Sequence, residues 1–327
     1  MYPIPKFEGP FSNVLTQFVK YKRSLGYDYG RTIVYRLNEM NRFFLNNGVK
    51  EMKITEHIFH KWIKIKNEEV RSNQGKRYFA IHGFAKFLIQ NGYSDIYDGI
   101  NPCIKNSSNF IPYIYTNNEI LRIFKAADNL KTVNRTFDYD HHLLMPVLLR
   151  LLYSTGLRIS EALHLRLSDI DFKRGNLMIK ESKNHVSRMV SVSKTMKDVL
   201  WNYRETMFFV NENDYLFHGH NGKQYQYSTV NKVFHQIILH AGITPLASGK
   251  LPRIHDLRFV FSICAFEQMK QKGYDLYTTL PILCKYLGHK GVAETEYYIR
   301  LTKNSFSSIT DAVDRYPFDI LPCIDDE

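Results

Sequence analysis

The sequence predicts a mainly α-helical protein with a small β-sheet, an α+β fold divided between two domains. The apolar residues of most segments recur at helical spacing, whereas a single segment alternates as strands do. A stretch rich in Pro, Asn and Ser interrupts the helical pattern about a third of the way along. With 327 residues the chain is long enough for two domains, each with its own core.

The first third of the chain has the pattern of an all-helical unit. Residues 11–50 predict two amphipathic helices, which end near Gly26 and Gly48. Two further helices are predicted at about 55–70 and 74–91. The apolar positions that define the first pair are Phe11, Val14, Leu15, Phe18, Val19, Leu37, Met40 and Phe44.

A linker separates this unit from the rest of the chain. The segment INPCIKNSSNFIPYIYTNNE, residues 100–119, has two prolines and an Asn/Ser-rich run. Thr116 and Glu119 have the spacing of a capping box, which predicts that a new helix begins there. We therefore expect domains at 1–112 and 113–327.

The second unit is predicted to be helical except for one hairpin. Its helices are expected at about 142–153, 154–172, 195–208, 228–241, 256–272 and 278–287. In RGNLMIKESKNHVSRMVSVS, apolar residues alternate on both sides of a polar turn, as in a β-hairpin. Leu177 and Ile179 belong to one arm, and Val190 and Val192 to the other.

The charge of the chain indicates a polyanionic partner. The formal net charge is +12, with a pI of about 9.3. Residues 1–112 contain 17 Lys and Arg against 9 Asp and Glu, so the excess is densest in the first third. This favours nucleic acid over a membrane surface. The basic residues near the ends of the predicted helices either line a phosphate backbone or form a solvated rim; they are Lys20, Lys22, Arg23, Arg71, Lys76 and Arg77.

The composition also indicates in which cellular compartment the protein is expected. The sequence has no run of about 18 apolar residues, so it predicts no membrane span. The first residues lack the pattern of a secretion signal. The four cysteines have no CxxC spacing, which argues against a cysteine-based zinc site or a disulfide framework: Cys103, Cys264, Cys284 and Cys323. We expect a cytoplasmic protein.

A metal or cofactor site is not predicted. The sequence has no Walker loop and no HExxH motif. Two short acidic stretches are the alternatives, at 138–142 and 169–171. The first precedes a predicted helix, where capping acids are common, and the second is interpreted as a turn.

Several residues of the second unit together suit one chemical problem, breaking a phosphodiester without a metal. Each alone has an ordinary structural explanation, such as an ion pair, a helix cap or a core contact. Fixed arginines stabilise the charge on the phosphoryl oxygens, and a His donates or accepts protons. A Lys can protonate the leaving oxygen, and a tyrosine hydroxyl can hold the phosphate covalently. The candidates are Arg158, Lys183, His255, Arg258, His289 and the pair Tyr297 and Tyr298.

The motifs that carry these residues resemble the tyrosine recombinases, the phage integrase family, over about 112–301. STGLRISEALHLRLSDID resembles the family's first arginine box, in which Arg158 would be catalytic and Glu161 its supporting acid. HDLR resembles the HxxR box and implies catalytic roles for His255 and Arg258.

Two further motifs complete the resemblance. LGHK followed by a tyrosine nine residues after His289 resembles the closing box, which implies that Tyr298, not its neighbour Tyr297, is the nucleophile. SKNHVSRMVSV resembles the hairpin that carries the family's lysine, and counting five residues back from Arg188 selects Lys183.

The resemblance implies a SAM-like core-binding domain at 1–112 and a mixed catalytic domain with a C-terminal tail at 113–327, clamping double-stranded DNA. It implies a site-specific recombinase that acts as a homo-tetramer on two sites, through a 3′-phosphotyrosine and a Holliday junction, without ATP, metal or cofactor. The role would be integration, transposition or replicon resolution. Neither the target sequence nor any accessory protein is predicted.

Two other classes use the same scaffold. A type IB topoisomerase would relax one duplex by the same chemistry, although the spacing from LGH to the tyrosine favours a recombinase. A non-catalytic DNA-binding protein would retain the fold alone. The tail after Tyr298 has apolar residues at helical spacing, and it is expected to dock either on a neighbouring subunit or on its own domain.

Overall fold

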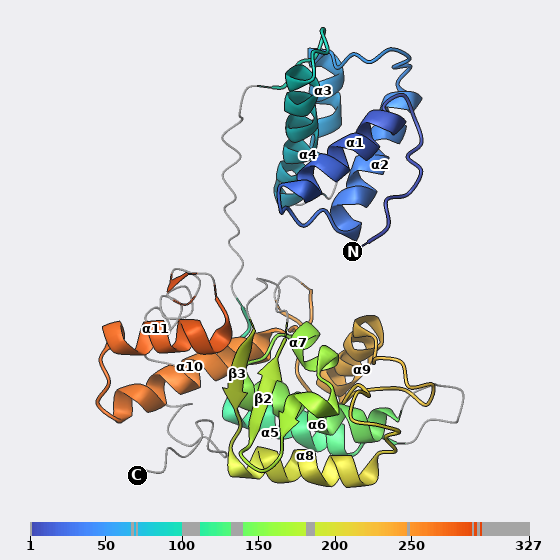
Figure 1. The fold of residues 1–327 in the computed structure, drawn as a ribbon. Helices are drawn as coiled ribbons and strands as arrows, with labels where there is room; N and C mark the ends of the chain where they lie inside the picture. The colour runs from blue at the N-terminus through green and yellow to red at the C-terminus, as the bar shows by residue number, and fades with distance from the viewer. Residues whose placement is uncertain are drawn as a thin grey trace. The chain divides into compact units, whose positions relative to one another are not determined.

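The computed structural model divides the chain into two compact units, residues 1–110 and 111–327, and each is described by itself (Figure 1). No helix among the residues described is both long and apolar enough to cross a membrane. The structure describes residues 2–66, 69, 71–99, 112–131, 140–180, 187–246, 249–289, 291, 292 and 295.

The first unit is helical, as the sequence predicts. Its helices are α1 (Ser12–Ser24), α2 (Arg31–Asn46), α3 (Glu56–Ile63) and α4 (Arg71–Gln90). Aromatic rings fill the core between them. The Phe84 ring of α4 lies edge-on to Phe11 and Phe18, with ring centroids 5.4 Å apart in both pairs. These edge-to-face contacts stabilise the packing of α1 on α4 beyond the burial of apolar area.

One helix of this unit is shorter than predicted. The pattern over 55–70 predicts a helix of about four turns, but α3 ends at Ile63 because Lys64 leaves the helical conformation, with ψ at 130°. The carbonyl oxygen of Lys64 accepts a hydrogen bond from Arg77 Nη2 at 2.7 Å. A tertiary contact therefore satisfies this carbonyl and replaces the next turn of helix.

The second unit combines helices with one sheet, so the predicted α+β class is confirmed. Thr116 and Glu119 form the predicted capping box at the start of α5: each side chain accepts from the other residue's backbone N–H. The helices are α5 (Asn117–Asp128), α6 (His141–Thr155), α7 (Ile159–His164), α8 (Lys194–Thr206), α9 (Tyr227–His240), α10 (Asp256–Gln271) and α11 (Leu276–Leu287), with a 3₁₀ turn at Leu167–Asp169.

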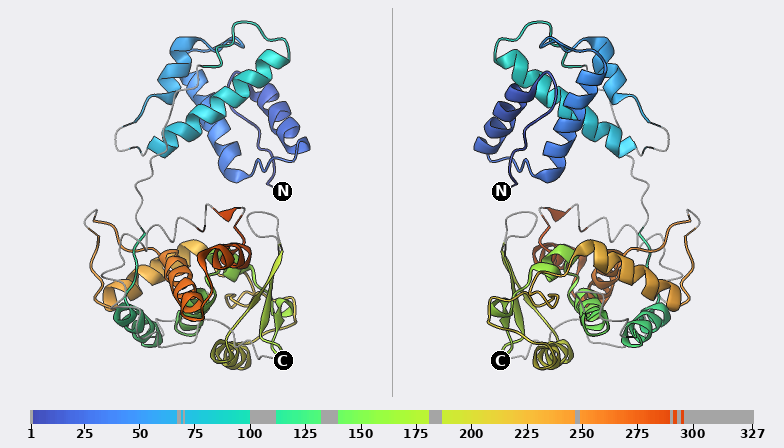
Figure 2. Two further views of the ribbon diagram at one scale, coloured as in Figure 1. Left: turned by 90° about the vertical axis from the view of Figure 1, so that its left-hand side faces the viewer. Right: turned by 90° about the vertical axis from the view of Figure 1, so that its right-hand side faces the viewer.

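The predicted hairpin forms two strands of a three-stranded antiparallel sheet. The strands are β1 (Ile170–Asp171), β2 (Asn176–Ile179) and β3 (Arg188–Ser191), in that spatial order. Leu177 pairs with Val190, and both side chains are fully buried. Figure 2 shows the sheet on one side of the helices of this unit. The inward face of the hairpin therefore closes the core of the second unit.

The prediction of one helix over 154–172 is wrong. Helix α7 has only six residues, and the chain then forms the 3₁₀ turn and β1, where 169–171 was interpreted as a turn. The backbone of this segment pairs with a distant one instead: Leu216 N donates to Leu165 O at 2.8 Å, and Leu167 N donates to Asp214 O at 3.1 Å. These long-range hydrogen bonds replace the local ones that would continue the helix.

Arg77 was expected either to line a phosphate backbone or to form part of a solvated rim, but it is a buried core residue. Its side chain is only 4% exposed, and Nη2 lies 2.7 Å from Glu69 Oε2. Its guanidinium carbon lies 5.7 Å from the centroid of the Trp62 ring. Arg77 therefore stabilises the first unit rather than reaching a ligand.

The burial of Arg77 predicts that substitutions at two neighbouring positions will change stability by different amounts. Arg77→Met should lower the free energy of unfolding of the first unit by about 3 kcal/mol, because it leaves the Glu69 carboxylate without its buried partner. Lys76→Met, at the exposed neighbouring position, should change it by less than about 0.5 kcal/mol. Thermal and urea unfolding followed by circular dichroism measure both. An Arg77→Met protein as stable as Lys76→Met would contradict the assignment.

Candidate active site

Three arginines converge on the C-terminal end of α11. The last carbonyl groups of a helix lack partners within the helix, and they carry its negative dipole end. Arg188 Nε donates to Tyr286 O at 2.7 Å, and Arg258 Nη2 donates to Leu287 O at 2.7 Å. Nη2 of Arg158 donates to the next carbonyl, Gly288 O, at 3.3 Å. Three consecutive carbonyl oxygens thus each bind a different arginine.

These arginines come from different elements of the second unit. Arg158 is the residue before α7, Arg188 begins β3, and Arg258 lies in the first turn of α10. Figure 1 shows β3, α11 and α10 next to one another in this unit. The end of α11 therefore joins segments that are far apart in the sequence.

A buried carboxylate links two of the three arginines. The Glu161 side chain is 3% exposed, and its Oε1 accepts from Arg158 Nη1 at 2.9 Å and from Arg188 Nη1 at 3.0 Å. Its Oε2 accepts from Arg188 Nη2 and from the backbone N–H of Arg158, both at 2.9 Å. Burial raises the pKa of this carboxyl, but the hydrogen bonds and charge of Arg188 and Arg158 outweigh it and lower the pKa below 4.5. Glu161 is therefore ionised.

Glycines allow the arginines to approach so closely. Gly288 ends α11 with φ +67°, and a Cβ atom there would lie 2.8 Å from Arg188 Nη1. Gly156 ends α6 with φ +60°, and its carbonyl oxygen accepts from Arg258 Nη1 at 2.7 Å. Both positions need a left-handed conformation and the absence of a side chain, because a Cβ atom at Gly156 would overlap Phe261 Cδ1.

His289 directly follows this helix end and is held by Arg258. Arg258 Nη2 lies 2.8 Å from His289 Nε2, and a guanidinium only donates, so Nε2 accepts. The proton of the neutral ring is then on Nδ1, which lies 2.8 Å from Thr295 Oγ1. Burial, followed by the charges of Arg258 and Arg158, lowers the pKa of His289 to about 3. His289 is therefore neutral near pH 7.

His255 lies at the start of α10 and is also neutral near pH 7. Burial, followed by the charges of Arg258 and Arg253, lowers its pKa to about 4, whereas Asp256 opposes this shift. Asp256 is almost fully buried and holds Arg253, with 2.9 Å between Oδ1 and Nη2. A neutral imidazole beside fixed cations can accept a proton from a hydroxyl group.

The structure brings together four of the six residues that the sequence predicts: Arg158, His255, Arg258 and His289. Arg158 is the most solvent-accessible arginine of the cluster, with 16% of its side chain exposed, against 7% for Arg188. Arg258 is buried. The other two, Lys183 and Tyr298, lie outside the described residues, as does Tyr297.

Arg188 is the residue that sequence reasoning missed. It entered the prediction only as a point from which to count back to Lys183. The signal was present in the strand pattern, because Arg188 lies two residues before Val190 and thus on the same inward face. A charged side chain on the inward face of a strand predicts a buried partner, which here is Glu161.

Lys180, at the end of β2, is engaged elsewhere. Its Nζ lies 2.5 Å from Oδ1 of Asp169, whose side chain is 5% exposed. This ion pair ties the exposed lysine to the 3₁₀ turn beside the sheet. Lys180 is therefore not among the residues that contact the arginine cluster.

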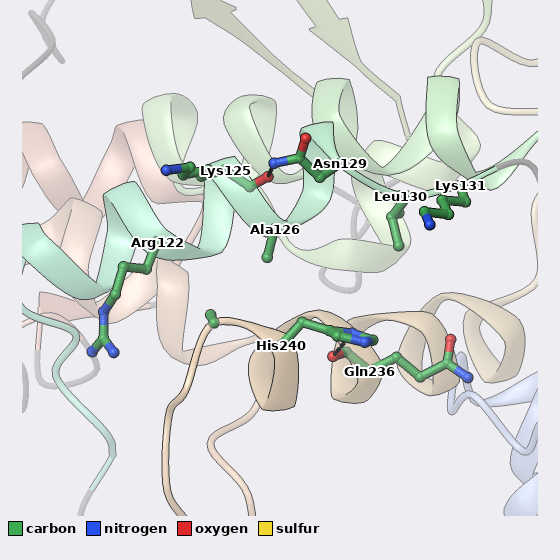
Figure 3. A pocket seen from close by; sticks show the side chains of 9 residues that line it. Arg122, Lys125, Ala126, Asn129, Leu130, Lys131, Gln236 and His240 are labelled. Atoms are coloured by element: carbon green, nitrogen blue, oxygen red, sulfur yellow. Dashed lines mark hydrogen bonds between the residues drawn. The ribbon is translucent and has the colours of Figure 1, made fainter.

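A separate pocket of about 720 Å³ lies between α5 and α9. Its lining is basic, with Arg122, Lys125 and Lys131 on one side and His240 on the other (Figure 3). Arg122 extends toward the loop after α9, where its Nη1 donates to Gly242 O at 3.4 Å. No residue of the arginine cluster lines this pocket.

The acidic stretch at 138–142 shows no metal-binding arrangement where it is described. Asp140 precedes α6, and its Oδ2 lies 3.5 Å from His220 Nε2. In the part of the chain that the structure describes, no three His, Cys, Asp or Glu side chains are grouped to hold a metal ion.

The close contact at Gly288 predicts a large effect of a single methyl group. Gly288→Ala should lower the free energy of unfolding by about 3 kcal/mol, because the methyl group displaces the buried Arg188 as well as straining the backbone. The matched control is Gly222→Ala, where φ is +69° but no atom lies within 4 Å of the added Cβ. This control should lose only about 1 kcal/mol. Equal melting temperatures of the two variants would show that the Arg188 contact is not needed.

Solved structures of DNA-processing proteins share this fold. A structure of the XerH site-specific recombinase bound to palindromic difH substrate has a TM-score of 0.64 and 17% identity, covering 96% of this chain and 99% of that one. A lambda integrase dimer bound to a COC′ core site has a TM-score of 0.59 and 16% identity, covering 85% of this chain and 96% of that one. At these identities the likeness shows the fold alone.

Curated relatives are more similar in sequence over parts of the chain. Two putative integrase/recombinases from Sinorhizobium fredii are 30% and 32% identical over 196 and 160 residues, which are 58% and 48% of this chain. These matches span 61% and 51% of the relatives' own lengths. The tyrosine recombinase XerC from Pediococcus pentosaceus is 24% identical over 239 residues, 71% of this chain and 72% of that protein.

The model of the phage integrase family matches residues 114–305. The matched range covers more than half of the chain and contains the whole arginine cluster with its shared carboxylate. Together with the relatives, it confirms the resemblance drawn from the sequence motifs. The chain belongs to the phage integrase family, the tyrosine recombinases.

Proposed function

We propose that this chain is a site-specific DNA recombinase that cleaves and rejoins duplex DNA through a 3′-phosphotyrosine. The observation that carries this proposal is the cluster of three arginines at the end of α11, two of which share one buried carboxylate, beside two neutral histidines. Family membership and the nature of the relatives support it. XerH and lambda integrase were solved with DNA, and a lambda integrase tetramer was solved on a Holliday junction.

The charge of the cluster suits a phosphodiester in the act of transfer. The three guanidinium groups carry a charge of +3, the Glu161 carboxylate carries −1 and both histidines are neutral, so the group carries a net charge of +2. A phosphoryl group in transfer spreads negative charge over its nonbridging oxygens, and fixed cations stabilise that charge without reorganising. Arg158, the most exposed of the three, contacts the phosphate in this proposal, and Arg258 acts beside it and holds His289.

The reaction needs two groups that the sequence motifs supply. The hydroxyl oxygen of Tyr298 attacks the scissile phosphorus and loses its proton to neutral His255. The bond from phosphorus to the 5′ oxygen breaks, and Lys183 gives that oxygen a proton. In the reverse direction, a 5′-hydroxyl of the partner strand attacks the phosphotyrosine and releases Tyr298. The bond energy is conserved in the phosphotyrosine, so strand exchange proceeds without ATP.

The partners in this proposal are duplex DNA and further copies of the chain. Residues 1–112 would bind the core of the site and residues 113–327 would carry catalysis, with four copies on two sites. The basic first unit provides phosphate contacts, so the affinity should fall steeply with salt. Whether the biological outcome is integration, transposition or resolution depends on the sites, which are found by selecting bound duplexes from a random-sequence library and mapping the cleaved ends.

The nucleophile is tested by removing one oxygen atom from each tyrosine in turn. Tyr298→Phe should eliminate the covalent protein–DNA adduct while DNA binding persists, because losing the hydrogen bond of one hydroxyl group costs only about 1 kcal/mol of stability. Tyr297→Phe, the matched control at the adjacent position, should retain the adduct. The substrate is the selected duplex with a nick beside the cleavage point, and adducts are resolved on a denaturing gel.

The position of the adduct decides the outcome. Peptide sequencing that maps the DNA to Tyr297, or an adduct that survives in Tyr298→Phe, would contradict the choice of phenol. No adduct from the unmutated chain on its selected site would instead identify a DNA-binding protein without catalysis. Relaxation of plasmids without recombination between two sites would identify a topoisomerase.

The general acid is tested by changing the leaving atom. Lys183→Ala should slow cleavage of normal DNA by about 100-fold or more. Replacing the scissile 5′ oxygen with sulfur should restore the rate, because a thiolate leaves without a proton. Lys180→Ala is the control, since that lysine pairs with Asp169 and should cleave both substrates at nearly the unmutated rate. A Lys183→Ala protein that sulfur does not rescue would assign the proton to another group.

A further inference from the structure

The negative charge of Glu161 conflicts with the binding of a phosphate by Arg158. Arg158 contacts Glu161 with its Nη1 at 2.9 Å and with its backbone N–H at the same distance. A buried carboxylate so close to one guanidinium would cancel its charge, and the low dielectric of the site strengthens that effect. A phosphate would then meet a neutral pair at Arg158. The supporting acid that orients the arginine would also weaken it.

Arg188 removes this conflict. Its two terminal nitrogens donate to the two oxygens of Glu161, at 3.0 and 2.9 Å, in the bidentate arrangement that gives the strongest pairing. The side chain is 7% exposed, so water screens this pair little. Because Arg188 and Glu161 neutralise each other, the positive charge of Arg158 remains for an anion.

Arg188 also fixes the position of a catalytic segment. Its Nε donates to Tyr286 O at 2.7 Å, and Gly288 leaves the space that its guanidinium occupies. The residue begins β3, so it stands at the base of the hairpin whose other strand, β2, ends shortly before Lys183. One side chain thus joins the hairpin, the first arginine box and the end of α11.

We propose that Arg188 is a positioning residue for DNA cleavage: it offsets the charge of Glu161 so that Arg158 can stabilise the phosphate, and it anchors β3, the strand that follows Lys183 in the chain. This inference rests on the proposed recombinase function for its consequence in cleavage. The binding of an anion by the cluster does not depend on that function. Lysine cannot replace Arg188, because a single ammonium group cannot contact both Glu161 oxygens and Tyr286 O in this geometry.

Anion binding tests the charge argument in the absence of DNA. Inorganic sulfate is titrated against the full chain, and the rise in melting temperature gives an apparent affinity. Arg188→Met should weaken sulfate binding about tenfold, because Glu161 then neutralises Arg158. Adding Glu161→Gln to Arg188→Met should restore most of that affinity, since the amide oxygen still accepts from Arg158 but carries no charge.

Cleavage tests the positioning argument. On the nicked selected duplex at saturating protein, Arg188→Met should form the adduct about 100-fold more slowly, with DNA affinity within about threefold. The double variant should be faster than Arg188→Met, and Arg188→Lys should lie between Arg188→Met and the unmutated chain. The matched control is Arg150→Met, which removes an arginine bidentate to Asp128, at 2.8 Å for both bonds, in the same unit. It should cleave at nearly the unmutated rate.

The outcomes separate this inference from the proposed function. If the unmutated chain forms no adduct, the recombinase proposal fails, and the sulfate titration alone decides the role of Arg188. If Glu161→Gln does not improve sulfate binding in the Arg188→Met background, the charge argument is wrong. If Arg188→Met cleaves as fast as Arg150→Met while the unmutated chain is active, Arg188 has no positioning role.

Discussion

The candidate site depends on one ionised carboxylate that is shared between two arginines. Glu161 is almost fully buried, and four N–H groups satisfy its two oxygens. A buried carboxylate without such partners would be costly, so the pairing and the fold support each other. Once Glu161 is fixed, Arg158 can reach the end of α11 from one side and Arg188 from the other. The geometry of the site follows from this single anion.

The same concentration of positive charge determines the chemistry of the histidines. Arginine retains its charge at any pH that matters, so the arginines cannot lose a proton to relieve the repulsion that protonated His255 and His289 would meet. They remain neutral instead, with pKa values lowered to about 4 and about 3. In His289 the contact with Arg258 also assigns the proton to Nδ1. A site rich in fixed cations thus contains uncharged imidazoles, which can form hydrogen bonds there without adding to the positive charge.

The sequence predicted those features that depend on neighbouring residues. Apolar periodicity located the helices, and alternation located β2 and β3. The motifs identified four candidates, Arg158, His255, Arg258 and His289. Each lies at or near the end of a regular element, where local spacing is informative. Patterns over a few residues carry no information on distant partners. The prediction of a helix at 154–172 was wrong because the backbone of this segment pairs with residues near 215, some fifty positions away.

Arg77 and Arg188 show the same limit for side chains. Arg77 was expected to line a phosphate backbone or to form a solvated rim, and Arg188 served only as a position from which to count back to Lys183, yet both are buried in ion pairs. The hydrogen bond from Arg188 to Tyr286 spans 98 residues, and that from Arg158 to Gly288 spans 130. A charged residue is placed by its partner, and the partner becomes a neighbour only in the folded chain. The position of an arginine along the chain therefore does not show which carboxylate it will pair with.

The arrangement also separates two tasks that a lone arginine would combine. An arginine that binds a transferring phosphate must have a fixed geometry. The hydrogen-bond acceptors that fix it also offset part of its positive charge. The carbonyl of Gly288 holds Arg158 without a full negative charge, and the charge of Glu161 is offset by Arg188. Orientation and electrostatic strength are thus provided by different residues. Because both sets of contacts meet at the end of α11, a shift of that helix end moves His289 and the arginines together, and the site is assembled or lost as one unit.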